Sequence, residues 1–275
     1  MKKKKKQHII PRCYLKHFQN NQGLVEAYNV DSNRIFQTNV EHVCNQNFAY
    51  EVSKNKVDNL LENELASLES EMSPYLDKLI NKVLIGDAKR EDINNYILFK
   101  YMTLLHIRTE SNRILFVRAL LRYEAMDHHM SLSELQNNQT YLKLFNLKFK
   151  ERSSLHSFLN LWYEKFQPEI RLGVSKTESF ITSDNPTITF YIPNDIDYFG
   201  IKFVLPIHPK ICIYYIASND KNISKEKQKD FPYIVRPETI YAYNQGIINV
   251  ANHWIISSEP FTLLQNNQIY KRFHL

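Results

Sequence analysis

The sequence predicts a single α+β domain over residues 1–275, with an N-terminal helical part packed on a C-terminal, mostly antiparallel sheet. Two observations lead to this prediction. The stretch Glu91–Ala125 contains no proline or glycine and repeats apolar residues at helical spacing. After Pro168 the pattern changes to short β-branched and aromatic runs bounded by Pro, Asn and Asp. Because the helices come first and the strands second, the order favours α+β over alternating α/β.

Three parts follow one another within this domain. Residues 7–55 form an N-terminal motif and hairpin, residues 56–167 are helical, and residues 175–275 are rich in sheet. We expect the N-terminal motif to pack across the junction of the other two parts. A pocket is expected at that junction.

Each of the first two parts has its own boundary signals. Pro11 can begin a short helix, because proline suits a first helical turn. Alternating residues at Leu24–Val30 and Arg34–Thr38 predict a hairpin. An apolar stripe along Val57–Val83 predicts a helix, which Pro74 is expected to split or kink.

The central helix, Glu91–Ala125, departs from its apolar stripe at one point. Continuing the stripe in helical steps leads to Arg108 and then to Asn112. A guanidinium on a buried stripe must reach solvent along its stem or meet a carboxylate. We therefore expect Arg108 to pair with Glu69 or Asp184, and Arg113 to lie on a solvated face.

The remaining elements follow in order, and a helix over Phe149–Phe166 is stopped by Pro168. Strands are predicted at residues 180–182, 187–192, 203–206, 211–216 and 254–257, with a helix at 239–251.

Composition excludes several classes of protein. The chain has only 5 glycines and neither a GxGxxG nor a GxxxxGK[ST] motif, so dinucleotide-binding and P-loop sites are excluded. The net charge of +6 comes largely from Lys2–Lys6; without these five lysines, 30 basic residues face 29 acidic ones. The tail is expected to be solvated, although a basic run can also contact nucleic acid or a membrane surface.

Cysteine usage and hydropathy predict a cytoplasmic protein. The 3 cysteines are far apart and lack CxxC spacing, so neither a disulfide framework nor a zinc knuckle is expected. No signal peptide and no apolar run of about 20 residues, the length of a membrane span, is visible.

The run Phe180-Ile-Thr-Ser-Asp-Asn-Pro186 ends a predicted strand with a carboxylate. A strand end fixes an acidic side chain rigidly, and many active sites use an acid in this way. Alternatively, Asp184 caps its own backbone in an Asx-type turn. Both interpretations stay open at this stage.

Several of these motifs together resemble the uncharacterised bacterial family called domain of unknown function 4238. The resemblance spans almost the whole chain, and its first and Ser-Asp-Asn-Pro motifs are fairly specific. The residues that carry it are His8, Pro11, Arg12, Tyr14, Leu15 and Phe18; Asn47, Phe48 and Tyr50; Leu68 and Glu69; Arg108, Thr109 and Arg113; Phe180–Pro186; Leu205–Pro209; and Asn244 and Asn249.

The resemblance implies that the recurring polar positions assemble into one pocket. The candidate catalytic residues are His8, Glu69, Arg108 and Asp184. Of these, His8, Glu69 and Asp184 are also candidate ligands for a divalent metal. Candidate binding residues are Arg12, Tyr14, Ser183, Asn185 and Asn244.

Two functions are compatible with such a pocket. The first is a hydrolase of the metal-dependent nuclease or phosphodiesterase type, acting on nucleic acid in bacterial defence against phage. The second is a non-enzymatic sensor or protein-interaction module whose polar motifs form a buried structural network. Convergence of His8, Glu69 and Asp184 in a cleft would favour the hydrolase. If Arg108 instead forms ion pairs with both Glu69 and Asp184, the hydrolase hypothesis is weakened.

Overall fold

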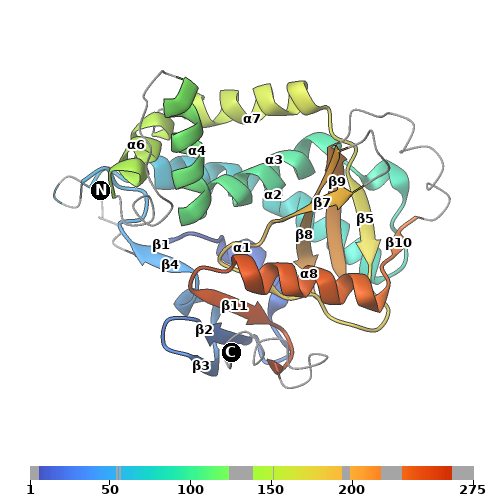
Figure 1. The fold of residues 1–275 in the computed structure, drawn as a ribbon. Helices are drawn as coiled ribbons and strands as arrows, with labels where there is room; N and C mark the ends of the chain where they lie inside the picture. The colour runs from blue at the N-terminus through green and yellow to red at the C-terminus, as the bar shows by residue number, and fades with distance from the viewer. Residues whose placement is uncertain are drawn as a thin grey trace.

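A computed structural model describes residues 6–53, 55, 57–123, 139–150, 152–193, 199–217 and 231–261 (Figure 1). Most of the lysine tail, residues 2–5, lies outside these ranges. The described part combines helices with three mostly antiparallel sheets, so the predicted α+β class is confirmed. None of its helices is long and apolar enough to cross a membrane.

Most of the described helices lie between residues 60 and 166, and α8 follows much later. The α-helices are α1 (Arg12–Leu15), α2 (Leu60–Leu84), α3 (Asn95–Ile107), α4 (Glu110–Tyr123), α6 (Gln139–Phe149), α7 (Arg152–Phe166) and α8 (Pro237–Val250), and the 3-10 helices are η1 (Lys16–Phe18), η2 (Val40–His42) and η3 (Arg90–Asp92).

The strands form sheets of two, five and four strands. They are β1 (Lys6–His8), β2 (Val25–Asn29), β3 (Arg34–Thr38), β4 (Asn45–Asn47), β5 (Arg171–Val174), β6 (Thr182–Ser183), β7 (Ile188–Pro193), β8 (Phe199–His208), β9 (Ile211–Ala217), β10 (Tyr233–Ile234) and β11 (Trp254–Ser257).

The five-stranded sheet, in the order β10-β5-β9-β8-β7, lies between two layers of helix (Figure 1). Side chains alternate between its faces, as a strand requires. On β9, Ile211 and Ile213 join the core under α2, α3 and α7, whereas Cys212 and Tyr214 join the core under α8. The sheet is therefore buried on both faces.

The four-stranded sheet, in the order β3-β2-β11-β6, joins both ends of the described chain. Its β2–β3 hairpin confirms the predicted one, with Val25 opposite Thr38 and Asn29 opposite Arg34. β11 inserts beside β2 and also pairs with β6, placing Ile255 opposite Ser183. Pairing between early and late strands holds the N-terminal segment against the second half.

The central helix is broken, which the sequence did not predict. α3 ends at Ile107, and α4 begins at Glu110 in a different direction (Figure 1). Thr109 Oγ1 and Asn112 Nδ2 donate to the His106 carbonyl at 3.2 and 2.9 Å. These side chains satisfy a carbonyl that a continuous helix would bond to a backbone N–H, so they stabilise the turn.

The expected split at Pro74 does not occur. α2 runs unbroken through it for 25 residues and is the longest described helix. Proline removes one backbone donor, but the buried stripe that includes Leu68, Met72 and Leu76 continues on both sides of it. Core packing along this stripe outweighs the local penalty.

Candidate functional site

Arg108 lies in the turn between α3 and α4 and is only 2% exposed. Its Nε donates to the Tyr50 hydroxyl at 3.0 Å, and its Nη2 donates to the His8 carbonyl at 2.7 Å. Nη1 donates to Glu69, so the ion pair expected from the apolar stripe forms with Glu69 and not with Asp184. Burial opposes the charge, but Tyr50 and Glu69 raise the pKa of Arg108 above its ordinary value. The guanidinium is a buried cation whose hydrogen bonds are made within the protein.

Arg113 is fully buried, so the prediction of a solvated face is wrong. Its Nη1 donates to the Ala49 carbonyl at 2.7 Å and to Asn146 Oδ1 at 3.4 Å. The guanidinium carbons of Arg113 and Arg108 lie 5.3 and 5.5 Å from the centre of the Tyr50 ring. Burial lowers the pKa of Arg113. The Tyr50 ring is therefore a shared cation–π partner for two buried arginines.

A chain of hydrogen bonds continues from Tyr50 to the start of α2. The Tyr50 backbone N–H donates to Gln7 Oε1 at 2.8 Å, and Gln7 Nε2 donates to Glu51 Oε1 at 2.9 Å. Glu51 also accepts the backbone N–H groups of Asp58 and Asn59, just before α2 begins. We call the connected set the Arg108 hub; its members are Gln7, His8, Tyr50, Glu51, Glu69, Arg108, Arg113 and Asn146.

His8 joins this hub through its backbone carbonyl. Its ring Nε2 is buried and has no hydrogen-bond partner in the part of the chain that the structure describes. Burial, together with the nearby charges of Arg12, Lys6 and Arg108, lowers the pKa of His8 to about 4. The ring is therefore neutral at pH 7, and the three neighbouring cations oppose binding of a metal ion beside it.

Asp184 is 2% exposed and holds the turn between α8 and β11. Its Oδ1 accepts the backbone N–H of Asn252 at 2.9 Å, and its Oδ2 accepts that of His253 at 2.7 Å. Burial raises the pKa of Asp184, while these N–H groups oppose the rise. The Asx interpretation expected Asp184 to cap its own backbone. The side chain does cap backbone, but that of a segment 68 residues further along the chain.

The metal set predicted from His8, Glu69 and Asp184 is not brought together. Glu69 pairs with Arg108, and both oxygens of Asp184 accept backbone N–H groups. Across the described ranges, no group of three or more His, Cys, Asp and Glu side chains is placed to hold a metal ion. The acids are separated because each satisfies a different set of buried donors.

The predicted binding residues near Asp184 also make contacts within the protein. Ser183 Oγ donates to the Asn185 carbonyl at 2.8 Å and accepts its N–H at 3.0 Å. Asn244 Oδ1 accepts the Ile181 N–H at 3.1 Å, and its Nδ2 donates to the Ser179 carbonyl at 2.9 Å. The two Asn244 bonds tie α8 to the segment before β6, whereas the Ser183 bonds are local.

The two remaining predicted residues, both from α1, have different environments. The buried Tyr14 hydroxyl donates to the Pro206 carbonyl at 2.6 Å and lies 2.7 Å from Thr182 Oγ1. Arg12 forms an ion pair with Glu41 at 2.9 Å, and both side chains are more than half exposed. Tyr14 therefore links α1 to two sheets, whereas Arg12 is a surface residue.

A polar cluster around His106 was missed by the sequence analysis. His106 Nδ1 lies 2.7 Å from Thr187 Oγ1 and 3.2 Å from Asn112 Nδ2. Asn112 Nδ2 also approaches Asn185 Oδ1 at 3.4 Å, and Asn185 Nδ2 donates to the Val250 carbonyl. Burial lowers the pKa of His106 to about 4. A lone histidine gives no spacing signal, although the stripe does place Asn112 one step beyond Arg108.

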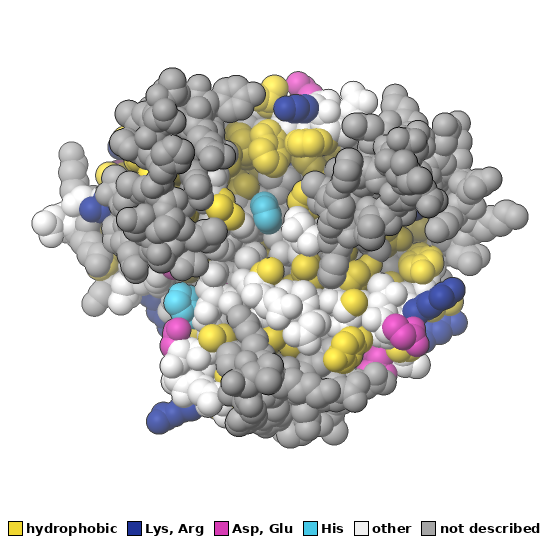
Figure 2. All heavy atoms as spheres, viewed as in Figure 1, with side chains coloured by type: hydrophobic (Ala, Val, Ile, Leu, Met, Phe, Trp, Pro, Cys, Tyr) yellow, Lys and Arg dark blue, Asp and Glu magenta, His cyan; other side chains and the backbone are white. Residues whose placement is uncertain are grey.

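His106 and Asn112 line a groove of about 550 Å³ bounded by α4, α6 and α7. Figure 2 shows hydrophobic side chains gathered around this hollow, beside α7. We call it the aromatic groove; its lining is His106, Ile107, Asn112, Leu115, Phe116, Lys148, Phe149, Ser154, Phe158, Leu161 and Trp162.

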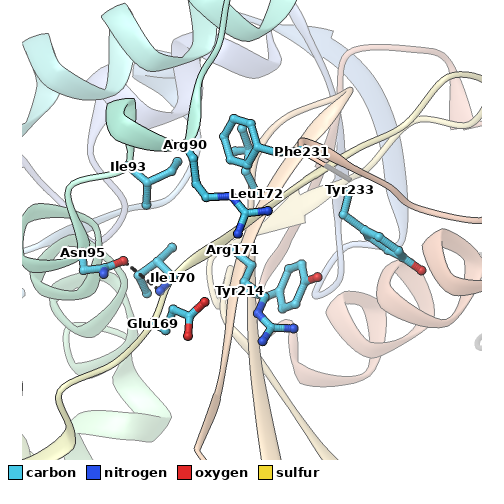
Figure 3. Close-up of a pocket in the computed structure, with 10 residues that line it drawn as sticks. All are labelled: Arg90, Ile93, Asn95, Glu169, Ile170, Arg171, Leu172, Tyr214, Phe231 and Tyr233. Carbon is cyan, nitrogen blue, oxygen red and sulfur yellow. Dashed lines mark hydrogen bonds between the residues drawn. The ribbon is translucent and has the colours of Figure 1, made fainter. Parts of the chain in front are cut away.

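A second cavity, of about 250 Å³, lies at the edge of the five-stranded sheet near β10 (Figure 3). It contains charges of both signs, from Arg90, Arg171 and Glu169, and Arg90 lies 6.0 Å from the centre of the Phe231 ring. All three charged residues already interact with other groups of the protein. The aromatic groove is therefore the better candidate for a ligand site.

The arrangement defines an α+β protein with a buried arginine hub and an open apolar groove. The chain belongs to the family described as "Protein of unknown function (DUF4238)", which matches residues 6–260 and confirms the resemblance seen in the motifs. No curated protein and no solved structure matches the chain significantly.

Proposed function

We propose that this protein acts by binding rather than by catalysis, as a sensor or interaction module whose polar motifs form a buried structural network. The observation that supports this proposal most directly is the use of Arg108. Its three nitrogens donate to Tyr50, Glu69 and the His8 carbonyl, which come from three other segments. A guanidinium that stabilised a transition state would need donors directed at substrate.

The carboxylates support the same conclusion. An acid that binds a metal or moves a proton needs a lone pair directed at the ligand or substrate. Both oxygens of Asp184 accept backbone N–H groups, and Glu69 is paired with Arg108. These residues are suited to holding segments together, because buried charges contribute to structure when their hydrogen bonds are satisfied.

The aromatic groove supplies what a binding module requires. Leu115 and Leu161 line it with 46% and 62% of their surfaces exposed. Exposed apolar side chains beside a concave surface are typical of a ligand or partner site. The groove is also separate from the Arg108 hub in its lining residues.

A melting and cleavage experiment tests this proposal against a metal-dependent nuclease acting in phage defence. Wild type, Glu69→Gln and Asp184→Asn would be melted with and without Mg²⁺, Mn²⁺ and Zn²⁺, then incubated with single- and double-stranded DNA and RNA. Glu71→Gln, an exposed neighbour on α2, is the matched control. We expect both test variants to lose roughly 4–10 °C in melting temperature, with no metal effect and no cleavage.

The nuclease hypothesis predicts a different pattern. A metal would stabilise wild type, Asp184→Asn would keep its fold but lose that gain, and cleavage would disappear with it. That result would overturn the binding proposal.

A further inference from the structure

We infer that the aromatic groove binds a planar aromatic or heteroaromatic small molecule through stacking and one hydrogen-bonding edge. This inference rests on the proposed binding function and names the chemical class of its ligand. It uses residues of the groove that take no part in the Arg108 hub.

The walls favour an aromatic occupant. The Phe158 ring centre lies 5.1 Å from that of Phe116, 5.4 Å from that of Phe149 and 4.8 Å from that of Trp162. These pairs are tilted or edge-to-face, the geometries in which aromatic rings attract each other. A flat ring entering the groove can extend this cluster, whereas an acyl chain would gain only apolar contact.

The polar end of the groove supplies the protein groups that would hydrogen-bond the edge of the ligand. His106 Nε2 and Asn112 Oδ1 have no hydrogen-bond partner among the described residues, and neither atom is fully buried. Each side chain is held by its remaining polar atom: His106 Nδ1 contacts Thr187 and Asn112, and Asn112 Nδ2 contacts His106 and Asn185. Two polar atoms on fixed side chains are pre-organised for a ligand.

The protonation state of His106 sets the charge at the polar end of the groove. Burial keeps its pKa near 4, so the ring is neutral at pH 7. A neutral imidazole and an amide offer hydrogen bonds without a full charge, which suits an uncharged amide-like or heterocyclic edge. Lys148, the charged residue of the lining, is exposed.

The positions of the 2 tryptophans make the inference measurable. Trp162 lines the groove, whereas Trp254 lies on β11 with its ring centre 6.1 Å from that of Phe36. Protein labelled with 5-fluorotryptophan gives one fluorine NMR signal for each, assigned with Trp162→Phe and Trp254→Phe. Three probes would be titrated: 2-quinolinone, naphthalene and decanoate. They represent a flat ring with a polar edge, the same shape without one, and an acyl chain.

We expect 2-quinolinone to shift the Trp162 signal saturably and to leave the Trp254 signal in place. In His106→Phe the Kd for 2-quinolinone should rise roughly tenfold, the effect of losing one hydrogen bond, while the Kd for naphthalene stays nearly unchanged. If His106→Phe does not fold, Leu161→Lys replaces it, because Leu161 is exposed and lines the groove. Leu147→Lys, exposed on α6 outside the groove, is the control and should bind as wild type does.

Three results would overturn the inference. They are no saturable Trp162 shift with either ring, a Trp162 shift with decanoate alone, and equal weakening of both rings by His106→Phe. None of them depends on whether nucleic acid is cleaved, so a failure here is distinct from a failure of the proposed function.

Discussion

Arg108 and Glu69 form an ion pair of unequal burial: the arginine side chain is 2% exposed and the glutamate side chain 19%. A charge buried this deeply depends on its partner, because the solvent that would otherwise stabilise it is excluded. The exposed fraction of Glu69 leaves that carboxylate partly solvated.

We therefore predict strong coupling between these two residues. Glu69→Gln should lower the free energy of unfolding by about 2–4 kcal/mol, because it leaves the Arg108 cation without its anion. After Arg108→Met, the same glutamate change should cost less, giving a coupling energy of about 1–3 kcal/mol. Urea unfolding of the wild type, both single variants and the double variant measures it.

Glu71→Gln in the same two backgrounds is the control for this cycle. Glu71 is exposed on α2, so its replacement should change stability by less than about 0.5 kcal/mol in either background. Additive effects of Glu69→Gln and Arg108→Met would show that the pair is not the centre of the hub.

Asp184 should control the turn between α8 and β11. In Asp184→Asn an amide replaces a carboxylate that accepts two backbone N–H groups, so one N–H loses its acceptor. We predict a loss of about 1–3 kcal/mol in stability and faster hydrogen exchange at Asn252 and His253. Exchange monitored by NMR tests this.

Asp87→Asn, an exposed change after α2, is the comparison for that experiment. It should leave exchange at both amides as in wild type. Unchanged exchange in Asp184→Asn would mean that the turn is held by other contacts.

Much of the fold was predictable from local pattern. The β2–β3 hairpin and β11 follow from alternating or β-branched runs, and these signals are contained in a few neighbouring residues. The partner of Arg108 was also within reach, because a cation on an apolar stripe requires an anion. Glu69 was one of two acids considered.

The errors arose where side chains override backbone propensity. Thr109 and Asn112 bond the His106 carbonyl and break the central helix, which no periodicity reveals. Extending one continuous helix past that point placed Arg113 on the wrong face, whereas α4 takes a new direction (Figure 1). His106 was missed because its partner Thr187 lies 81 residues away. The sequence shows both residues but not their contact.

Tyr14 should stabilise the junction of α1 with the second half of the chain. Its hydroxyl donates to the Pro206 carbonyl at 2.6 Å and contacts Thr182 at 2.7 Å, both buried. Tyr14→Phe keeps the ring and leaves these groups without the hydroxyl, so we predict a loss of about 1–3 kcal/mol in urea unfolding. Tyr233→Phe, at a residue that is 40% exposed, should be nearly neutral. Equal stability of the two variants would contradict a structural role for the Tyr14 hydroxyl.

His253 should make stability depend on pH above neutrality. The Glu110 carboxylate, 3.9 Å from its Nε2, and the Asp31 carboxylate, 2.8 Å from its Nδ1, raise the pKa of His253 to about 9, against the effect of burial. Because the folded-state pKa lies above the unfolded value of 6.5, the added stability is complete below that value and is lost as pH rises through about 9. The side chain is 41% exposed, so solvent screening limits the contribution to about 1 kcal/mol or less.

The measurement for His253 is the difference in unfolding free energy between wild type and His253→Gln at pH 6, 8 and 10. We expect wild type to hold its advantage at pH 6, to keep less than half of it at pH 8 and to lose it by pH 10. High salt should reduce the advantage, because the charges involved are partly exposed. An advantage that grew with pH would contradict the sign derived from the raised pKa.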